Sequence, residues 1–281
     1  MRLWDYHTHS NFCDHAIGSL EDYVQSAVSQ NLIQIGLTAH FPMTYLPKSF
    51  HHYAMSLEDL PLYFNETNRL KIKYCDEIEI LIGLEVDYFK KSFNQIKKVI
   101  KKHRGKFDYL IGSVHAIPWD RYEALPIDMK NAVPIIKKLG IDNVFLKYYE
   151  TMDELVNTGF FEIIAHFDLL KKNGLIPEKN EMIYQKILSI LDHIKEKDII
   201  IEINTSGLRK AIKESFPSDN IIREVIKRNI PMILCSDAHN PNDVAHSFNE
   251  TIVKLKKLGL TELYEYEIKD ESLKKVPKRI P

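Results

Sequence analysis

Histidine and carboxylate side chains recur at spacings that suit metal ligation. His7 and His9 are one residue apart in DYHTHS, and Asp237 and His239 are one residue apart in CSDAH. In an extended segment, both side chains of such a pair point to the same side of the strand. Each pair could therefore bind one ion jointly.

Further potential ligands stand where short apolar runs end. These are His40 in LTAHFP, Glu85 in GLEVDY, His115 in GSVHAI and His166 in AHFD, while His15 follows the first pair. Nitrogen and oxygen donors without a thiolate pair favour zinc, iron or manganese. Because the donors outnumber those that one ion with three protein ligands can use, we expect two or three divalent metal ions. Glu85 suits a bridging position because a carboxylate has two oxygens.

The elements that must position these residues alternate between apolar runs and segments of helical period. The pattern predicts strands over 3–7, 33–39, 78–85, 109–114, 161–165, 199–203 and 232–235, and helices over 19–30, 58–74, 93–103, 143–157, 178–196 and 219–228. Repeated strand–helix units predict parallel strands joined by right-handed crossovers. Seven units favour a closed α/β barrel over residues 1–281 as one domain, with the active site at the C-terminal ends of the strands. An open doubly wound sheet is the alternative, although no GxGxxG follows the first strand.

The remaining segments are less regular. We expect loops over the barrel mouth at 41–56 and 116–140, a helix over 243–258 and an edge strand over 263–268. Ser19, with Asp22 three residues later, resembles a capping box, and Ser218 can begin the helix that follows it.

Composition excludes several classes of partner. The 38 Lys and Arg nearly balance the 39 Asp and Glu, which argues against nucleic-acid binding through bulk positive charge. No stretch approaches the roughly 18–20 apolar residues of a membrane span. The 3 cysteines are widely spaced, so we expect no disulfide framework and a cytoplasmic location. The oligomeric state stays open.

Taken in order, the motifs DYHTHS, LTAHFP, GLEVDY, GSVHAI, AHFD, EINTSGLRK and CSDAH resemble those of the PHP (polymerase and histidinol phosphatase) superfamily. The resemblance is greatest to the monofunctional histidinol-phosphatase family and extends from Asp5 to about Asn242. It implies a distorted (β/α)7 TIM-like barrel with a trinuclear metal centre. It also implies how the ligands divide: His7, His9 and Asp237 at a first metal; Glu85 as the bridge to a second, with His115 and His166; and His15, His40 and His239 at a third.

The resemblance further implies an enzyme of histidine biosynthesis that hydrolyses L-histidinol phosphate to L-histidinol and phosphate. Metal ions can lower the pKa of water to about 7 and so supply hydroxide for in-line attack on phosphorus. On this hypothesis Glu85 and Asp237 act through the metals, while Asp168 or a metal-bound water protonates the leaving alkoxide. The alternative for Asp168 is that it orients His166 or caps the segment that follows.

Residues that bind the substrate are harder to predict. Arg209, in the segment NTSGLR that includes Ser206, is a candidate phosphate clamp because guanidinium can bind phosphate through two hydrogen bonds. Its alternative is a solvated arginine in a loop. Candidates for contact with the imidazole and amine of the substrate are Tyr45, Phe50, Trp119 and Asp120.

Three other functions compete with this one. The first is a PHP-family phosphoesterase that acts on another small phosphate ester or a nucleotide. The second is a metal-dependent amidohydrolase, which Glu85, the final Asp237 and His239, and the lack of a bridging lysine at a strand end disfavour. The third is a non-catalytic module like that of replicative polymerases, which the complete set of ligand positions disfavours.

Overall fold

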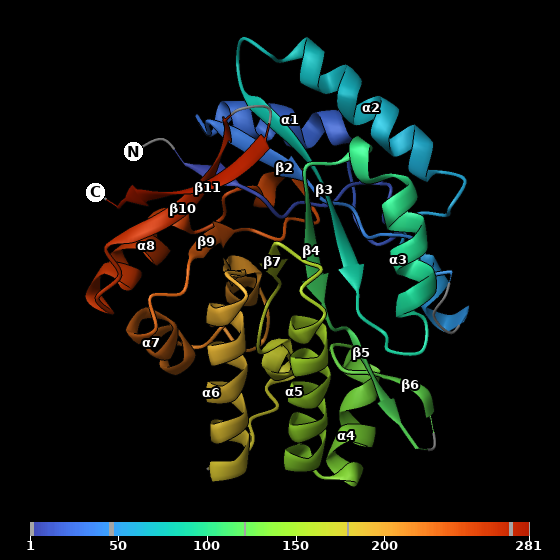
Figure 1. The fold of residues 1–281 in the computed structure, drawn as a ribbon, viewed down its shortest axis with the longest axis vertical. Helices are drawn as coiled ribbons and strands as arrows, with labels where there is room; N and C mark the ends of the chain where they lie inside the picture. Colours follow the sequence, from blue (N-terminus) through green and yellow to red (C-terminus); the bar gives the residue numbers. More distant parts are fainter. Residues whose placement is uncertain (1–2, 45–47, 121, 179, 270–271, 281) are drawn as a thin grey trace.

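The computed structural model describes residues 3–44, 48–120, 122–178, 180–269 and 272–280. Its central feature is a sheet of seven parallel strands in the order β1-β2-β3-β4-β7-β8-β9. The strands are β1 (Trp4–Asp5), β2 (Gln34–Leu37), β3 (Glu79–Asp87), β4 (Tyr109–Ser113), β7 (Ile163–Ile164), β8 (Ile200–Asn204) and β9 (Met232–Cys235). They form a distorted, nearly closed TIM-like barrel, as the sequence predicts (Figure 1).

The first and last strands come together to close the barrel. An isolated parallel bridge joins Thr8 to Ala238, and His9 N–H donates to the Ala238 carbonyl at 2.9 Å. The buried Asp5 carboxylate also accepts hydrogen bonds from the backbone N–H groups of Ser236 and Ala245, each at 3.0 Å. The closure therefore holds the DYHTHS and CSDAH segments side by side.

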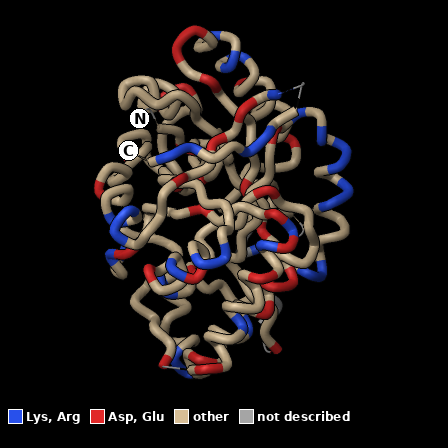
Figure 2. Tube along the Cα trace, turned by 60° about the vertical axis from the view of Figure 1, so that its left-hand side comes forward, with Lys and Arg blue, Asp and Glu red and all other residues tan. Residues whose placement is uncertain are grey.

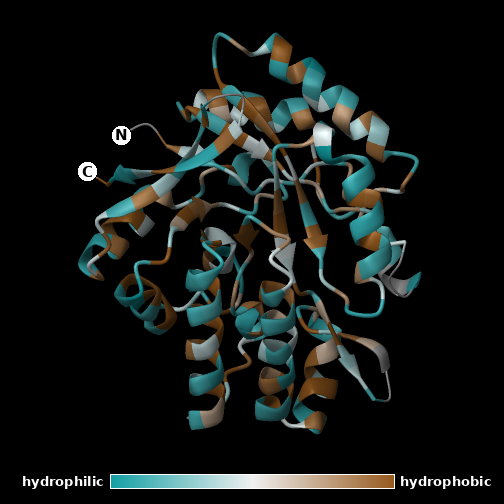
Figure 3. Ribbon diagram, viewed as in Figure 1, coloured by the Kyte–Doolittle hydropathy of each residue, from teal (hydrophilic) through white to brown (hydrophobic). Residues whose placement is uncertain are grey.

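Helices surround the strands (Figure 1). They are α1 (Leu20–Ser29), α2 (Leu60–Lys73), α3 (Phe93–Lys102), α4 (Val133–Leu139), α5 (Ile141–Asn157), α6 (Glu181–Glu196), α7 (Asp219–Lys227) and α8 (Phe248–Lys257). The barrel strands are mostly apolar, whereas the helices alternate between apolar and polar positions (Figure 3), as expected of helices that cover a buried sheet. The capping box at Ser19 and Asp22 is present.

Aromatic side chains fill the barrel away from the ligand end. An added Cβ at Gly36 would lie 1.8 Å from Tyr109 Oη, and one at Gly83 would lie 2.8 Å from the same ring. Both positions therefore require glycine so that Tyr109 can occupy the interior. Its hydroxyl donates to the Tyr6 carbonyl at 2.6 Å, and its ring stacks on Tyr266.

Two segments differ from the prediction. The region 116–140, expected to be a loop, contains an antiparallel hairpin of β5 (Ala116–Trp119) and β6 (Tyr122–Pro126), followed by α4. Prolines within these short elements hid their periodicity. The predicted edge strand is instead β10 (Glu262–Lys269), which pairs with β11 (Ser272–Arg279) in a separate antiparallel sheet.

Basic and acidic positions are interspersed along the trace of the chain in this view (Figure 2). Within the described ranges, none of the helices has the length and apolar character needed to cross a membrane.

Candidate metal centre

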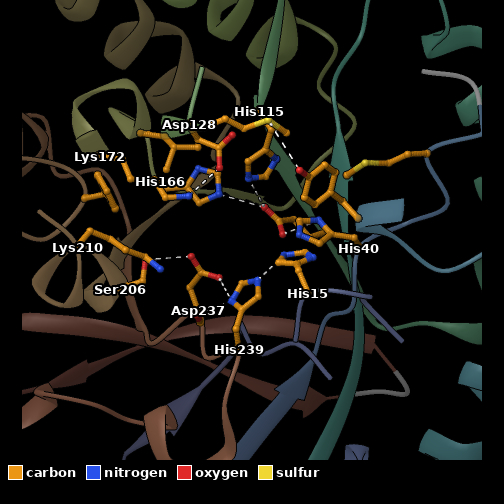
Figure 4. Close-up of a pocket in the computed structure, with 16 residues that line it drawn as sticks. His15, His40, His115, Asp128, His166, Lys172, Ser206, Lys210, Asp237 and His239 are labelled. Carbon is orange, nitrogen blue, oxygen red and sulfur yellow. Dashed lines mark hydrogen bonds and ion pairs between the residues drawn. The ribbon is translucent and has the colours of Figure 1, made fainter. Parts of the chain in front are cut away.

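The predicted ligands converge at the C-terminal ends of the barrel strands. His7 and His9 follow β1, His40 follows β2, Glu85 lies in β3, His115 follows β4, His166 follows β7, and Asp237 and His239 follow β9. A cavity of about 330 Å³ opens there, and its walls include most of these side chains (Figure 4). The two other ligand candidates, His7 and His9, are buried beneath it and contact Glu85.

Glu85 stands at the centre of the cluster. Its Oε2 lies 3.2 Å from His7 Nε2, 3.4 Å from His9 Nε2 and 3.1 Å from His40 Nδ1. Its Oε1 lies 3.1 Å from His166 Nε2 and 3.8 Å from His115 Nε2. The two oxygens thus face different groups of histidines, which is the arrangement that a bridging carboxylate needs.

The remaining ligands extend the cluster toward the mouth. Asp237 Oδ1 lies 3.1 Å from His9 Nε2 and 3.4 Å from His239 Nδ1. His239 Nε2 lies 2.9 Å from His15 Nε2 (Figure 4). Donors bound to one tetrahedral zinc ion at 2.0–2.1 Å stand about 3.3 Å apart. The separations in the cluster are close to this value, so the donor set fits divalent metal ions.

Among the described residues, three overlapping triads have donor atoms within 4.8 Å of one another. They are His9 with His40 and His239; His7 with His9 and Glu85; and His40 with Glu85 and His115. These triads show how tightly the donors are packed. They do not assign each donor to one ion, so the division among three metals stays a prediction.

Outer partners hold several ligand rings in place. Glu202 Oε2 lies 2.7 Å from His7 Nδ1, and Glu202 Oε1 accepts the backbone N–H of His166 at 2.9 Å. Asp87 Oδ1 lies 3.0 Å from His115 Nδ1. A partner at Nδ1 leaves Nε2 free to face the cluster and fixes the ring's orientation.

The sequence analysis did not identify Glu202 or Asp87. Glu202 lies in β8, the strand that contributes no direct ligand, and a lone glutamate in an apolar run carries no spacing signal. Asp87 lies two residues after Glu85 and therefore on the same side of β3, which is the signal that could have revealed it.

Without metal, protons on neighbouring histidines compensate Glu85, which is buried, and Asp237, which is partly buried. Burial favours the neutral forms of Glu85 and Asp237, but the surrounding histidines outweigh it and hold both pKa values well below the usual range. Burial also disfavours a charged His7, yet Glu202 and Glu85 raise its pKa well above the usual value. Likewise, Asp87 overcomes burial and raises the pKa of His115 to about 10.

Four other histidines of the cluster are neutral instead. Burial, reinforced by His239, lowers the pKa of His9 to about 3 and that of His15 to about 4. Burial also lowers the pKa of His40 and His239. Neutral imidazole is the form that binds a metal ion.

The candidate substrate-binding residues lie in different places. Ser206 lines the cavity, and its hydroxyl donates to Asp237 Oδ2 at 3.0 Å. Arg209 is not among the described residues that line the cavity. Its Nη2 donates to the carbonyls of Ser236 at 2.9 Å and Asp237 at 3.2 Å, and its Nε is 3.3 Å from an Asp243 oxygen.

Asp168 is also absent from the described lining of this cavity. Its Oδ2 lies 3.0 Å from Lys171 Nζ and accepts the Ser218 N–H at 2.9 Å. Ser218 is the N-cap of α7, as the sequence predicts, but its side chain makes no capping hydrogen bond. Asp168 precedes the 3-10 helix Leu169–Asn173 but makes no side-chain capping bond to it, so the predicted capping role is not seen. Its role as a leaving-group acid stays a prediction.

The lining contains further residues that the sequence analysis did not single out. Lys172, Lys210 and Asp128 contribute charge, and Met43, Tyr53, Met129, Leu169 and Phe216 contribute an apolar wall. Among the earlier candidates for substrate contact, Trp119 and Asp120 are outside the described lining, Tyr45 falls outside the described residues, and the side chain of Phe50 is not described.

Comparison with known proteins places these observations in a family. The family model described as PHP domain matches residues 5–206. A protein of Deinococcus radiodurans named probable histidinol-phosphatase is 30% identical over 260 residues, which cover 92% of this chain and 94% of the relative. The histidinol-phosphatase of Bacillus subtilis is 29% identical over 264 residues, which cover 88% of this chain and 97% of that protein.

A solved structure shows the same fold. It is the crystal structure of histidinol phosphate phosphatase from Lactococcus lactis complexed with zinc, L-histidinol and phosphate. The TM-score is 0.74 at 22% identity, and the match covers 97% of this chain and 99% of that one. From the family model and the curated relatives, the chain belongs to the PHP domain family and, within it, to the histidinol-phosphatase family.

Proposed function

We propose that the protein is a metal-dependent phosphatase that hydrolyses L-histidinol phosphate to L-histidinol and phosphate. The observation that carries the proposal is Glu85, whose two oxygens face separate groups of histidines beside an open cavity. The choice of substrate is supported by the histidinol-phosphatase relatives and by the zinc, L-histidinol and phosphate named for the Lactococcus lactis protein.

The proposed ligands are His7, His9, His15, His40, Glu85, His115, His166, Asp237 and His239, for two or three divalent ions. When bound, such ions lower the pKa of water to about 7 and neutralise the oxygens of a phosphate ester. The chain itself orients the ligands: Glu202 holds His7, and Asp87 holds His115. Ser206 holds the second oxygen of Asp237, so that its Oδ1 faces His9.

Positive side chains on the cavity wall suit a phosphate dianion. Lys172 and Lys210 both line the cavity (Figure 4). A nearby ammonium stabilises phosphate oxygens, and lysine commonly binds phosphate in this way. We assign phosphate contact to these lysines, while Arg209 supports the backbone on either side of the Ser236–Asp237 peptide.

The apolar part of the wall suits the other end of the substrate. Tyr53 packs edge-on against His15 at a ring distance of 5.5 Å, and its hydroxyl is 3.8 Å from Met129 Sδ. Flat aromatic ligands pack well against such aromatic and thioether groups. This surface provides a place for the imidazole of histidinol phosphate beside the metal centre.

Substrate competition tests the proposal. Phosphate release is measured for L-histidinol phosphate, p-nitrophenyl phosphate and nucleoside monophosphates, with and without chelator. We expect chelator-sensitive hydrolysis and a kcat/KM for L-histidinol phosphate that exceeds the others by orders of magnitude. A preference for a nucleotide or another small ester would refute the substrate assignment and favour the alternative phosphoesterase.

A variant tests the role of Glu85. Glu85→Gln keeps the size of the side chain but removes the charge that faces both histidine groups. We expect loss of turnover and a lower metal content in the purified protein. An unchanged metal stoichiometry would contradict the bridging role.

A further inference from the structure

The cavity holds one carboxylate that the metal centre leaves unassigned. Of the described lining residues, the acidic ones are Glu85, Asp237 and Asp128, and the first two belong to the proposed ligand set. Asp128 follows β6 and lies on the same side of the cavity as His115 and His166 (Figure 4). A negative charge at this place would repel a phosphate dianion. A carboxylate here therefore suits a ligand that carries a positive group as well as the phosphate.

Local contacts hold Asp128 in place while leaving it accessible. Its Oδ2 lies 2.7 Å from Lys172 Nζ, and its backbone carbonyl accepts a hydrogen bond from Asn173 Nδ2 at 2.9 Å. Both partners belong to the 3-10 helix η4 (Leu169–Asn173). The side chain is 20% exposed, so its carboxylate is fixed at the cavity wall but still open to a ligand.

Asp128 is ionised in the protein. Burial opposes the charged form, but the ammonium of Lys172, 2.7 Å away, outweighs it and holds the pKa of Asp128 below its usual value. A carboxylate has about four acceptor sites, so the hydrogen bond to Lys172 does not exhaust its capacity. The remaining sites can accept hydrogen bonds from a second cation.

The proposed substrate carries such a cation. In L-histidinol phosphate, an ammonium group is attached to the carbon next to the one that bears the phosphate ester. When the phosphate is bound at the metal centre, the ammonium therefore lies close to the cavity wall that includes Asp128. Simple phosphate esters and nucleotides have no ammonium at this position.

We propose that Asp128 is a specificity-determining residue that binds the α-ammonium group of the substrate. Lys172 positions the Asp128 carboxylate and also lines the cavity where we place the phosphate. The Asp128–Lys172 ion pair therefore connects the proposed ammonium site to the proposed phosphate site. This inference rests on the proposed function. It predicts selection for phosphate esters with an adjacent amine, and a much smaller contribution of Asp128 to the hydrolysis of esters without one.

The test uses a pair of esters that differ only in the amine. L-Histidinol phosphate is compared with 3-(imidazol-4-yl)propyl phosphate in the wild type, in Asp128→Asn and in Asp153→Asn. Asp153 is a matched control because it is also a partly buried carboxylate paired with a lysine, Lys186 at 2.5 Å, but in the α5–α6 interface.

We expect the wild type to prefer the amine-bearing ester by roughly 10- to 150-fold in kcat/KM, the range for a hydrogen bond to a charged group. D128N should lose this preference because it slows far more on L-histidinol phosphate than on the ester without an amine, and D153N should behave as the wild type. Equal losses on both esters, or no loss on either, would overturn the inference. A wild type that hydrolyses neither ester would instead overturn the proposed function, and this inference with it.

Two further measurements test the inference even if D128N does not fold. Asp128→Glu keeps the charge but displaces it by one methylene, so the preference should fall without disappearing, and an unchanged preference contradicts the inference. In the wild type, L-histidinol should inhibit more strongly than 3-(imidazol-4-yl)propan-1-ol. Equal inhibition by the two alcohols would also contradict it.

Discussion

Metal binding to the metal-free protein should release about two protons at pH 7. His7 and His115 each hold an extra proton there, because Glu202 and Asp87 overcome the effect of burial on the pKa values of these rings. His9 and His15, with pKa values of about 3 and about 4, are already neutral and release none. Glu85 and Asp237 are already ionised.

The raised pKa values of His7 and His115 determine how metal affinity changes with pH. A group whose pKa is raised in the metal-free protein must lose a proton before its nitrogen can bind an ion, so affinity rises with pH. For His115 this gain continues up to a pH of about 10, where the ring is half deprotonated without metal. Between pH 7 and 8, His115 alone should therefore raise the binding constant by roughly one order of magnitude, and His7 should raise it further.

Isothermal titration calorimetry can count the protons. Zinc is titrated into the metal-free protein in buffers that differ in ionisation enthalpy, and the slope of the observed enthalpy gives the number released. Asp87→Asn removes the carboxylate 3.0 Å from His115 Nδ1, so the count should fall to about one. Asp153→Asn is the control: it removes the carboxylate 2.8 Å from His193, outside the centre, and should leave the count unchanged.

Two results would refute this reasoning. Release of no protons by the wild type would mean that the carboxylates are not compensated by protonated histidines. An unchanged count in D87N would mean that Asp87 does not control the proton on His115.

Three other substitutions test separate parts of the structure. In Glu202→Gln the new NH₂ must face a hydrogen-bond donor, because one Glu202 oxygen contacts His7 and the other accepts the His166 N–H. Metal affinity, measured by competition titration, should therefore fall about 10- to 100-fold. Unchanged affinity would contradict the role of Glu202. Gly36→Ala should lower the free energy of unfolding in urea by about 1–3 kcal/mol because the added Cβ meets Tyr109, and a second substitution, Tyr109→Phe, should recover part of this loss. The control is Gly105→Ala, which has no atom within 4 Å of the added Cβ and should unfold like the wild type. Equal effects at both glycines would argue against the packing explanation. Asp168→Asn should lower the free energy of unfolding by about 1–3 kcal/mol because its contacts with Lys171 and Ser218 are weakened, and kcat should change little. A folded variant with a large drop in kcat would instead support a role for Asp168 in the reaction.

Position along the chain allowed the ligand set to be predicted. Each of His40, His115 and His166 directly follows an apolar run, and parallel strands bring such positions together at one end of the barrel. The barrel itself follows from the same repeated strand–helix pattern. The location of these residues could be predicted because the geometry of a parallel sheet converts sequence position directly into location, whereas their binding of metal stays a prediction.

Residues outside that geometry could not be placed in this way. Asp128 and Lys172 lie in segments between strands, where the path of the chain depends on packing rather than on periodicity. Arg209 belongs to a predicted site segment, yet its Nη2 donates to two backbone carbonyls and the residue is outside the described lining of the cavity, so its role as a phosphate clamp stays a prediction. The direction of a long side chain depends on its neighbours in space, which spacing along the sequence does not specify.

The most direct test of the central claim is metal-dependent hydrolysis of L-histidinol phosphate. The protein is stripped of metal, its metal content is verified by elemental analysis, and zinc or manganese is added in increments while phosphate release is followed. We predict no turnover without metal and recovery as two to three equivalents bind. Turnover by verified metal-free protein, or a fully loaded protein that releases no phosphate, would contradict the claim that this histidine cluster is a catalytic metal centre.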